Sequence, residues 1–277
     1  MEILNTPTEE QINKYNHLLE YLKSLESVAI AFSSGVDSTF LLFAAKEALD
    51  DKMMAVTAVT SSFPQREKNE AVDFCEKYNI HHELCNIDVM KIEGFTQNPP
   101  NRCYICKRAI FENIIDVANS NNIPAIAEGS NLDDNGDYRP GLLAIAELGV
   151  KSPLREAGLT KYDIRVLSKF LNLPTWEKPS YACLATRFVY GETISEEKLA
   201  MVDKGEQLLI DLGFHQMRVR IHDRMARIEV LPEEFVKLLD DNIRLKIVNA
   251  FKEYGFDYVS MDLVGYRTGS MNEVLDK

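Results

Sequence analysis

The residues at 33–38 read Ser-Ser-Gly-Val-Asp-Ser and follow directly on the apolar run at 28–32. Small side chains leave the backbone uncovered, so several N–H groups can converge on one anion at the positive end of a following helix. The segment lacks the lysine and the four-residue spacer of a Walker A loop. An ordinary strand-to-helix turn is the alternative to the phosphate-binding loop that we predict from Ser33, Ser34, Gly35, Val36, Asp37 and Ser38.

A second polar block, Glu-Gly-Ser-Asn-Leu-Asp-Asp at 128–134, follows another short apolar run. Carboxylates beside a phosphate site suit Mg²⁺, which takes oxygen ligands and bridges phosphate groups. A solvated turn rich in Asn and Asp is the alternative. The candidate magnesium ligands are Asp37, Glu128, Asp133 and Asp134.

Cys183 lies in a connector bounded by Pro179 and Gly191, and Arg187 follows it by four residues. A loop lets a thiol move, and a nearby guanidinium favours the thiolate, which is the nucleophilic form. A lone cysteine is otherwise a small buried apolar residue. We therefore take Cys183 as the candidate catalytic residue and Arg187 as a candidate substrate contact.

Arg218 and Arg220 are two positions apart on a predicted strand at 217–222, so they point to one face. Two guanidinium groups on one face can clamp a substrate phosphate. The alternative is a solvent-facing strand edge that carries charge against aggregation. Glu206 and Glu229 are candidate further metal ligands in this part of the chain.

Cys103 and Cys106 form a C-x-x-C pair, which can be a redox pair or half of a zinc site. The sequence offers no second pair at zinc-ligand spacing. The family resemblance described below makes these cysteines the alternative sulfur carriers and neighbouring Arg102 a candidate contact for an anionic substrate.

Apolar, β-rich runs alternate with helical patterns through the first half of the chain. The predicted strands are 28–32, 53–59, 82–87 and 125–128, and the predicted helices between them are 39–49, 66–78 and 107–119. This alternation predicts an α/β fold with a doubly wound parallel sheet, which binds ligands at the carboxyl ends of its strands. The candidate ligand contacts at those ends are Ala58, Thr60, Ser61, Gly129 and Asn131, and the family resemblance described below implies that they contact adenine and ribose.

Prolines at 174 and 179 in a polar run mark a predicted domain boundary. We expect a first domain at 1–178 and a smaller α+β domain at 179–277. The second domain has a predicted helix at 195–212, strands at 217–222, 226–231 and 258–263, and one or two helices at 232–254.

The 277 residues carry a formal net charge of −12, which argues against a nucleic-acid partner. Five cysteines, an odd number, suit a reduced compartment better than a disulfide framework. Because no apolar stretch is long enough to cross a bilayer and no signal sequence is visible, we expect a cytoplasmic protein without a membrane partner.

The opening loop resembles the S-G-G-x-D-S pyrophosphate loop of the ATP pyrophosphatase (PP-loop) superfamily, with Ser34 in place of the second-position glycine. Further motifs follow in order: E-G-S-N-x-D-D, R-P-G, S-P-L-R-E, L-T-K-x-D-I-R and K-P-x-x-x-C-L-A-T-R. In the fourth of these, Thr160 and Asp163 predict a capping box, with Asp in place of the usual Glu, at the start of a predicted helix at 161–171. Together the motifs resemble the LarE family, the ATP-dependent sacrificial sulfur transferases of nickel-pincer cofactor biosynthesis. The resemblance runs from about residue 28 to about residue 270.

The resemblance implies a two-stage reaction that uses ATP and Mg²⁺. ATP adenylates a carboxylate of pyridinium-3,5-biscarboxylic acid mononucleotide, and the cysteine that matches Cys183 then displaces AMP. Cleavage of the Cβ–S bond leaves a thiocarboxylate on the substrate and dehydroalanine on the protein. A sister group uses extra cysteines and an iron–sulfur cluster, but the Cys183 segment holds no second cysteine, which favours the sacrificial route.

The resemblance also implies a homo-oligomer, a nucleotide substrate, and a functional link to the other enzymes that make the cofactor of lactate racemase. Three alternatives stay open. One is a tRNA thiolase of the same superfamily that uses Cys103 or Cys106 with Cys183. The others are an amidotransferase-like synthetase and a module that senses AMP or ATP without turnover.

Overall fold

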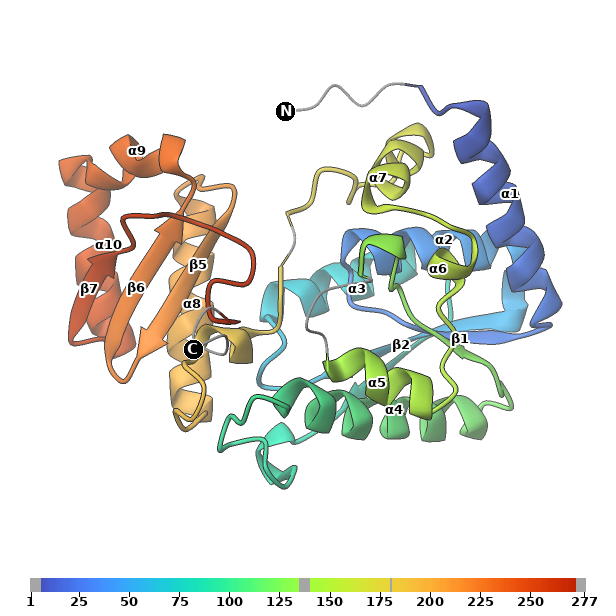
Figure 1. Ribbon diagram of the computed structural model, residues 1–277, viewed down its shortest axis with the longest axis horizontal. Helices are drawn as coiled ribbons and strands as arrows, with labels where there is room; N and C mark the ends of the chain where they lie inside the picture. Colours follow the sequence, from blue (N-terminus) through green and yellow to red (C-terminus); the bar gives the residue numbers. More distant parts are fainter. Residues whose placement is uncertain (1–5, 135–139, 180, 273–277) are drawn as a thin grey trace. The chain divides into compact units, whose positions relative to one another are not determined.

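A computed structural model describes residues 6–134, 140–179 and 181–272 of the chain. It divides into two compact units (Figure 1). The first holds residues 1–60, 65–87 and 103–181, and the second holds 61–64, 88–102 and 182–277. The sequence suggested a single boundary after residue 178, whereas the second unit also takes in two short segments from the loops that follow the second and third strands. Contacts of such distant segments leave no local signal in a sequence.

The first unit is built on a parallel sheet in the order β3-β2-β1-β4. Its strands are β1 (Val28–Ala31), β2 (Met53–Val59), β3 (His82–Asn86) and β4 (Ile126–Ala127). The chain moves outward from β1 to β3 and then returns to place β4 on the other side of β1. The loops that follow β1 and β4 therefore meet at the topological switch point, where sheets of this kind bind ligands.

Helices cover both faces of this sheet (Figure 1). One apolar core holds side chains of α1 (Glu9–Ser24), α2 (Val36–Leu49), α3 (Gln65–Lys77) and α7 (Lys161–Phe170). The other holds side chains of α4 (Arg102–Ser120) and α5 (Pro140–Glu147). The short helix α6 (Pro153–Glu156) precedes α7. Two covered faces explain why β1 and β2 read as continuous, mainly apolar runs, whereas β3 at the edge of the sheet is more polar.

The second unit carries a small mixed sheet in the order β5-β6-β7. Strands β5 (Met217–His222) and β6 (Met225–Val230) are antiparallel, and β7 (Tyr258–Met261) runs parallel to β6. Its helices are α8 (Glu196–Asp211), α9 (Phe235–Leu239) and α10 (Asp241–Tyr254). Gly205 lets α8 approach α10 closely, because a Cβ there would lie 3.0 Å from the Phe251 ring.

The predicted α/β architecture with a small α+β part is confirmed, and most element bounds agree within two residues. Helix α2 starts at Val36, three residues before its predicted start, because the end of the loop forms its first turn. The capping box of Thr160 and Asp163 is present at the start of α7. Arg139 of the R-P-G motif and Ser180 of the cysteine segment lie outside the described residues. None of the described helices is long and apolar enough to cross a membrane.

Candidate active site

The segment between β1 and α2 has the geometry of an anion-binding loop. Gly35 is the N-cap residue of α2, in extended conformation, and no side-chain hydrogen bond from the described residues caps the helix there. The hydroxyl of Ser38 accepts a hydrogen bond from the Ser33 N–H at 3.3 Å and lies 3.2 Å from the Ser33 hydroxyl. The N–H groups of the first helical turn are thus left for a ligand at the positive end of the helix dipole.

Asp37 joins the loop to two other segments. Its Oδ2 lies 2.5 Å from Nζ of Lys161 at the start of α7, and its Oδ1 accepts a hydrogen bond from Asn131 Nδ2 at 3.4 Å. Asp133 in turn accepts a hydrogen bond from the Lys161 N–H at 2.8 Å. The loop, the segment after β4 and the start of α7 therefore converge at the switch point of the sheet.

The acidic residues after β4 mainly build their own turn. The Glu128 carboxylate accepts hydrogen bonds from the Ser130 N–H, the Ser130 hydroxyl and the Ser152 hydroxyl. Asp134 accepts one from the Asn131 N–H at 2.9 Å. Among the described residues, no group of three or more His, Cys, Asp or Glu side chains is arranged to hold a metal ion.

For Mg²⁺, the carboxylate that fits is that of Asp37, which lies on the loop itself and has 24% of its side chain exposed. A phosphate-bound magnesium ion needs few protein ligands, since phosphate oxygens and water complete its octahedron. The magnesium roles of Asp37, Glu128, Asp133 and Asp134 stay predictions.

Gly129 sets how closely the segment after β4 approaches the loop. A Cβ at this position would lie 3.0 Å from the Ser38 nitrogen and 3.3 Å from the Asp37 Cβ. With ATP as the ligand that the family resemblance implies for this loop, we expect Gly129→Ala to raise the KM for ATP by about 10-fold, because the added methyl group displaces the loop. Pyrophosphate release at varied ATP concentration measures this, with the melting temperature as the control for folding. An unchanged KM would contradict a role for this close approach.

The other predicted adenine contacts are more scattered. Ala58 and Thr60 lie at the carboxyl end of β2, next to β1, and Asn131 lies at the loop. Ser61 belongs to the second unit. The adenine and ribose roles of all these residues stay predictions.

Cys183 is the exposed one among the five cysteines. Its backbone carbonyl starts the short 3₁₀ turn Leu184–Arg187 and accepts hydrogen bonds from the Thr186 N–H at 3.0 Å and hydroxyl at 2.8 Å. The Leu184 N–H donates to the Ser62 carbonyl at 3.0 Å. Buried Arg102 donates to the Ala185 carbonyl at 2.9 Å. The turn is therefore held on several sides while Cys183 remains at the surface.

Arg102 was predicted to contact the substrate, and in the structure it braces the turn after Cys183. Its guanidinium also bonds to Asn98 and lies over the Tyr190 ring, 5.8 Å from the centroid. A substrate contact of Arg102 stays a prediction.

Arg187 and Glu206 form a fully buried, bidentate ion pair, with N–O distances of 2.7 and 2.9 Å. Burial by itself would raise the pKa of Glu206, but Arg187 outweighs it and holds this pKa below the usual range. Arg187 also donates to the Thr186 hydroxyl at 2.7 Å and to the Cys183 carbonyl at 3.3 Å. Both Glu206 carboxylate oxygens are thus occupied by a guanidinium, a different role from the predicted metal ligation.

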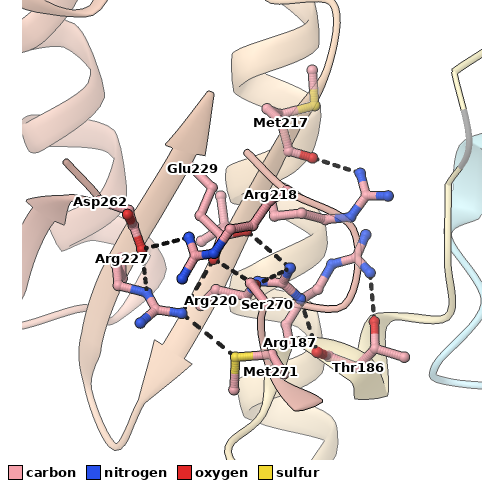
Figure 2. Close-up of polar contacts among 12 residues, drawn as sticks. Thr186, Arg187, Met217, Arg218, Arg220, Arg227, Glu229, Asp262, Ser270 and Met271 are labelled. Atoms are coloured by element: carbon pink, nitrogen blue, oxygen red, sulfur yellow. Dashed lines mark hydrogen bonds and ion pairs between the residues drawn. The ribbon is translucent and has the colours of Figure 1, made fainter. Parts of the chain in front are cut away.

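Figure 2 shows Arg220 in a network of polar groups and Arg218 bonded to the Met217 carbonyl. Arg220 donates to Glu229 and Ser270, both at 2.9 Å, and to the Thr186 carbonyl at 3.0 Å. Arg218 donates to the Met217 carbonyl at 2.6 Å. With 4% and 5% exposure, the two arginines do not form a solvent-facing strand edge, so that alternative is wrong.

Glu229 is held by arginines, as Glu206 is. It lies fully buried and bonds to Arg220 at 2.9 Å, Arg227 at 3.1 Å and the Ser270 hydroxyl at 2.9 Å. Arg220 and Arg227 are direct cross-strand partners, so Glu229 also separates two like charges. The predicted metal role of Glu229 has no support in these contacts.

We call Arg187, Arg218, Arg220 and Arg227 the arginine cluster (Figure 2). Burial, followed by repulsion from Arg187, lowers the pKa of Arg218 to about 10. Burial also lowers the pKa of Arg220, although Glu229 opposes this. The four guanidinium groups lie against the carboxylates of Glu206, Glu229 and Asp262, which offset much of their charge. Guanidinium groups match the oxygens of a phosphate.

Comparisons with known proteins bear on this site. The chain is 35% identical over 261 residues to pyridinium-3,5-bisthiocarboxylic acid mononucleotide synthase of Lactiplantibacillus plantarum, a match that covers 94% of each chain. The chain belongs to the LarE family. It is also 38% identical to an uncharacterized protein of a Synechocystis strain, over 96% of this chain and 99% of that one. No family model matches.

A more distant relative supports the superfamily. Argininosuccinate synthase of Natronomonas pharaonis is 30% identical over 146 residues, which are 48% of this chain and 36% of that enzyme. The LarE-family chain is thus an enzyme with an ATP-binding PP-loop fold.

The C-x-x-C pair of this LarE-family chain lies on the first turns of α4, in the first unit. Cys103 is half-buried and Cys106 is buried. Their role as alternative sulfur carriers stays a hypothesis that the Cys183 variants below test.

Two lysines at the loop were absent from the sequence-based candidates. Lys161 pairs with Asp37, and Lys178 donates to Ser34. Both stand in motifs that carry the LarE resemblance, L-T-K-x-D-I-R and K-P-x-x-x-C. The first was interpreted only through its helix cap and the second only through its cysteine, so the basic residue in each was the available signal.

Replacing Arg218 or Arg220 by methionine should have very different effects on the stability of the protein. Arg220→Met removes one of the two arginines that pair with buried Glu229, so we expect a loss of about 3 kcal/mol in the free energy of unfolding. Burial lowers the pKa of Arg218, so the fold disfavours the charged form of this side chain. Arg218→Met removes the charge, and we therefore expect an unchanged or higher free energy of unfolding. Urea denaturation measures both. Equal losses would contradict the assigned charge balance.

Proposed function

We propose that this LarE-family enzyme uses ATP to place sulfur on a carboxylate of pyridinium-3,5-biscarboxylic acid mononucleotide. The observation that carries the proposal lies within the second unit. The backbone carbonyl of exposed Cys183 accepts hydrogen bonds from Thr186 and from Arg187 of the arginine cluster, and Arg220 of the same cluster donates to the Thr186 carbonyl. The residue that carries the nucleophilic sulfur is thus linked through its backbone carbonyl to guanidinium groups, which suit the phosphate of a mononucleotide.

The first stage is adenylation. A substrate carboxylate attacks the α-phosphorus of ATP, pyrophosphate leaves, and an acyl adenylate forms. A carboxylate oxygen is a poor leaving group, and adenylation converts it into AMP, a good one. The loop amides at the start of α2, with Lys161 beside them, offset the charge of the departing pyrophosphate. Mg²⁺ held at Asp37 would supply further charge neutralisation.

The second stage is sulfur transfer from Cys183. Its thiolate adds to the acyl carbon and expels AMP, which forms a thioester. Loss of the Cys183 Cα proton then breaks the Cβ–S bond, and its electron pair leaves with the thiocarboxylate. Dehydroalanine remains at position 183, so one enzyme chain delivers one sulfur atom. The product would be the thiocarboxylate precursor of the nickel-pincer cofactor.

Substrate-dependent pyrophosphate release tests the first stage. The enzyme is incubated with ATP, Mg²⁺ and the pyridinium dicarboxylate mononucleotide, and pyrophosphate, AMP and thiocarboxylate are measured. We expect one pyrophosphate and one AMP for each thiocarboxylate, and none without the mononucleotide. Pyrophosphate release that requires tRNA, or that requires ammonium ions and is independent of Cys183, would contradict the proposal. No release with any of these acceptors would favour a sensor of AMP or ATP.

A further inference from the structure

Ser34 holds an unusual backbone conformation for a residue with a side chain. Its φ is +54°, in the left-handed region, and it is 2% exposed. A Cβ makes this region unfavourable, which is why glycine is common there. The loop therefore needs other interactions to keep Ser34 in place.

Three hydrogen bonds supply them. The Ser34 hydroxyl donates to the Glu67 carbonyl at 3.0 Å, a contact with the first turn of α3. The Lys178 ammonium donates to the Ser34 carbonyl at 2.9 Å and to the Ser34 hydroxyl at 3.3 Å. Two of the three bonds thus come from one lysine, 144 residues further along the chain.

Lys178 is itself held in place. Its ammonium forms an ion pair with Glu70 of α3, and 11% of its side chain is exposed. Its carbonyl accepts a hydrogen bond at 2.9 Å from Arg165 of α7, which also donates to the Trp176 carbonyl at 2.5 Å. The lysine is therefore anchored at both ends, by its backbone on α7 and by its ammonium between α3 and the loop.

We propose that Lys178 is a positioning residue for ATP binding, which acts by holding Ser34 in its left-handed conformation. The inference rests on the proposed function only in taking ATP as the ligand of the loop. Residue 34 at φ +54° orients the peptide groups on either side of it, including the N–H of Gly35, the N-cap of α2. Lys178 thereby compensates for the absence of glycine at this position.

A double-mutant cycle on Ser34 and Lys178 tests the proposal. Affinity for α,β-methylene-ATP, measured by calorimetry with Mg²⁺, reports on the loop without requiring turnover. We expect Lys178→Met to raise the Kd by about 10-fold in the Ser34 background. In the Ser34→Gly background, where the conformation is free of Cβ strain, the same change should raise the Kd by less than about 3-fold. Lys178→Arg, which keeps donors and charge, should stay within about 3-fold of the parent.

A Kd that rises equally in both backgrounds would mean that Lys178 binds the phosphates directly, and this would overturn the proposal. A lower melting temperature with an unchanged Kd would overturn it too, because the role would then be only structural. If the Lys178→Met variant does not fold, the same double-mutant cycle is measured with Lys178→Gln. The enzyme could bind the analogue and show the expected difference between the two backgrounds, yet form no thiocarboxylate. That result would refute the proposed function and leave this inference standing.

Discussion

Replacing Cys183 by alanine should abolish thiocarboxylate formation, with a loss of about 10³-fold or more, while ATP is still cleaved in the presence of substrate. We expect this result because the residues proposed for the two stages belong to different units. The loop, Asp37 and Lys161 belong to the first unit, whereas Cys183 lies in the second. Alanine at position 183 removes the sulfur and leaves the backbone bonds of the turn in place. Product by mass spectrometry and pyrophosphate by a coupled assay separate the two stages.

Cys85→Ala is the matched control for this variant. Cys85 is a half-buried thiol on β3, outside the residues assigned to the reaction, so its replacement should leave the product yield within about 2-fold. Cys103→Ala and Cys106→Ala test the alternative sulfur carriers. Full product from Cys183→Ala, or loss of product from a C-x-x-C variant alone, would contradict the role of Cys183.

Asp37→Asn should lower the rate of pyrophosphate release by about 10²- to 10³-fold. The substitution keeps the size of the side chain and removes its charge. It therefore takes away the carboxylate that fits Mg²⁺ and releases Lys161 from its 2.5 Å ion pair. The assay is pyrophosphate release at saturating ATP and substrate, and the effect should fall on the first stage.

Asp50→Asn is the control, because Asp50 is an exposed carboxylate at the opposite end of the same helix. It pairs with Lys46 at 2.7 Å, so the substitution also breaks a lysine–aspartate pair. We expect its activity to stay within about 2-fold of the parent, as for other exposed ion pairs. Equal activity losses in both variants would show that the effect of Asp37→Asn is not specific to the loop.

Much of the fold was predictable because periodicity is a local property. The β1 and β2 runs read as buried strands, and Thr160 with Asp163 indicated the start of α7, as the structure has it. The loop was predictable for the same reason, since small residues between a strand and a helix are adjacent in sequence. Its closest partners were not, because Lys161 and Lys178 reach it from more than 120 residues away.

The ion pairs of the second unit could not be predicted from the sequence. The spacing of Arg218 and Arg220 predicts two arginines on one face of a strand, and both lie buried on β5, while their role as a phosphate clamp stays a prediction. The sequence gives no sign that the nearby carboxylates pair with arginines, and we predicted them to be metal ligands. Glu206 instead binds Arg187, and Glu229 binds Arg220 and Arg227. A carboxylate pairs with whichever cation the fold brings closest, and this pairing depends on cross-strand register and on the approach of α8 to β5.

The central claim is that Cys183 is the sulfur donor, and peptide mass spectrometry after a single turnover tests it most directly. The enzyme is incubated with ATP, Mg²⁺ and the pyridinium dicarboxylate mononucleotide, and its peptides are analysed together with the thiocarboxylate product. We predict that the Cys183 peptide alone loses the mass of H₂S, in equal amount to the thiocarboxylate formed. Thiocarboxylate formed beside an unchanged Cys183 peptide would contradict the account.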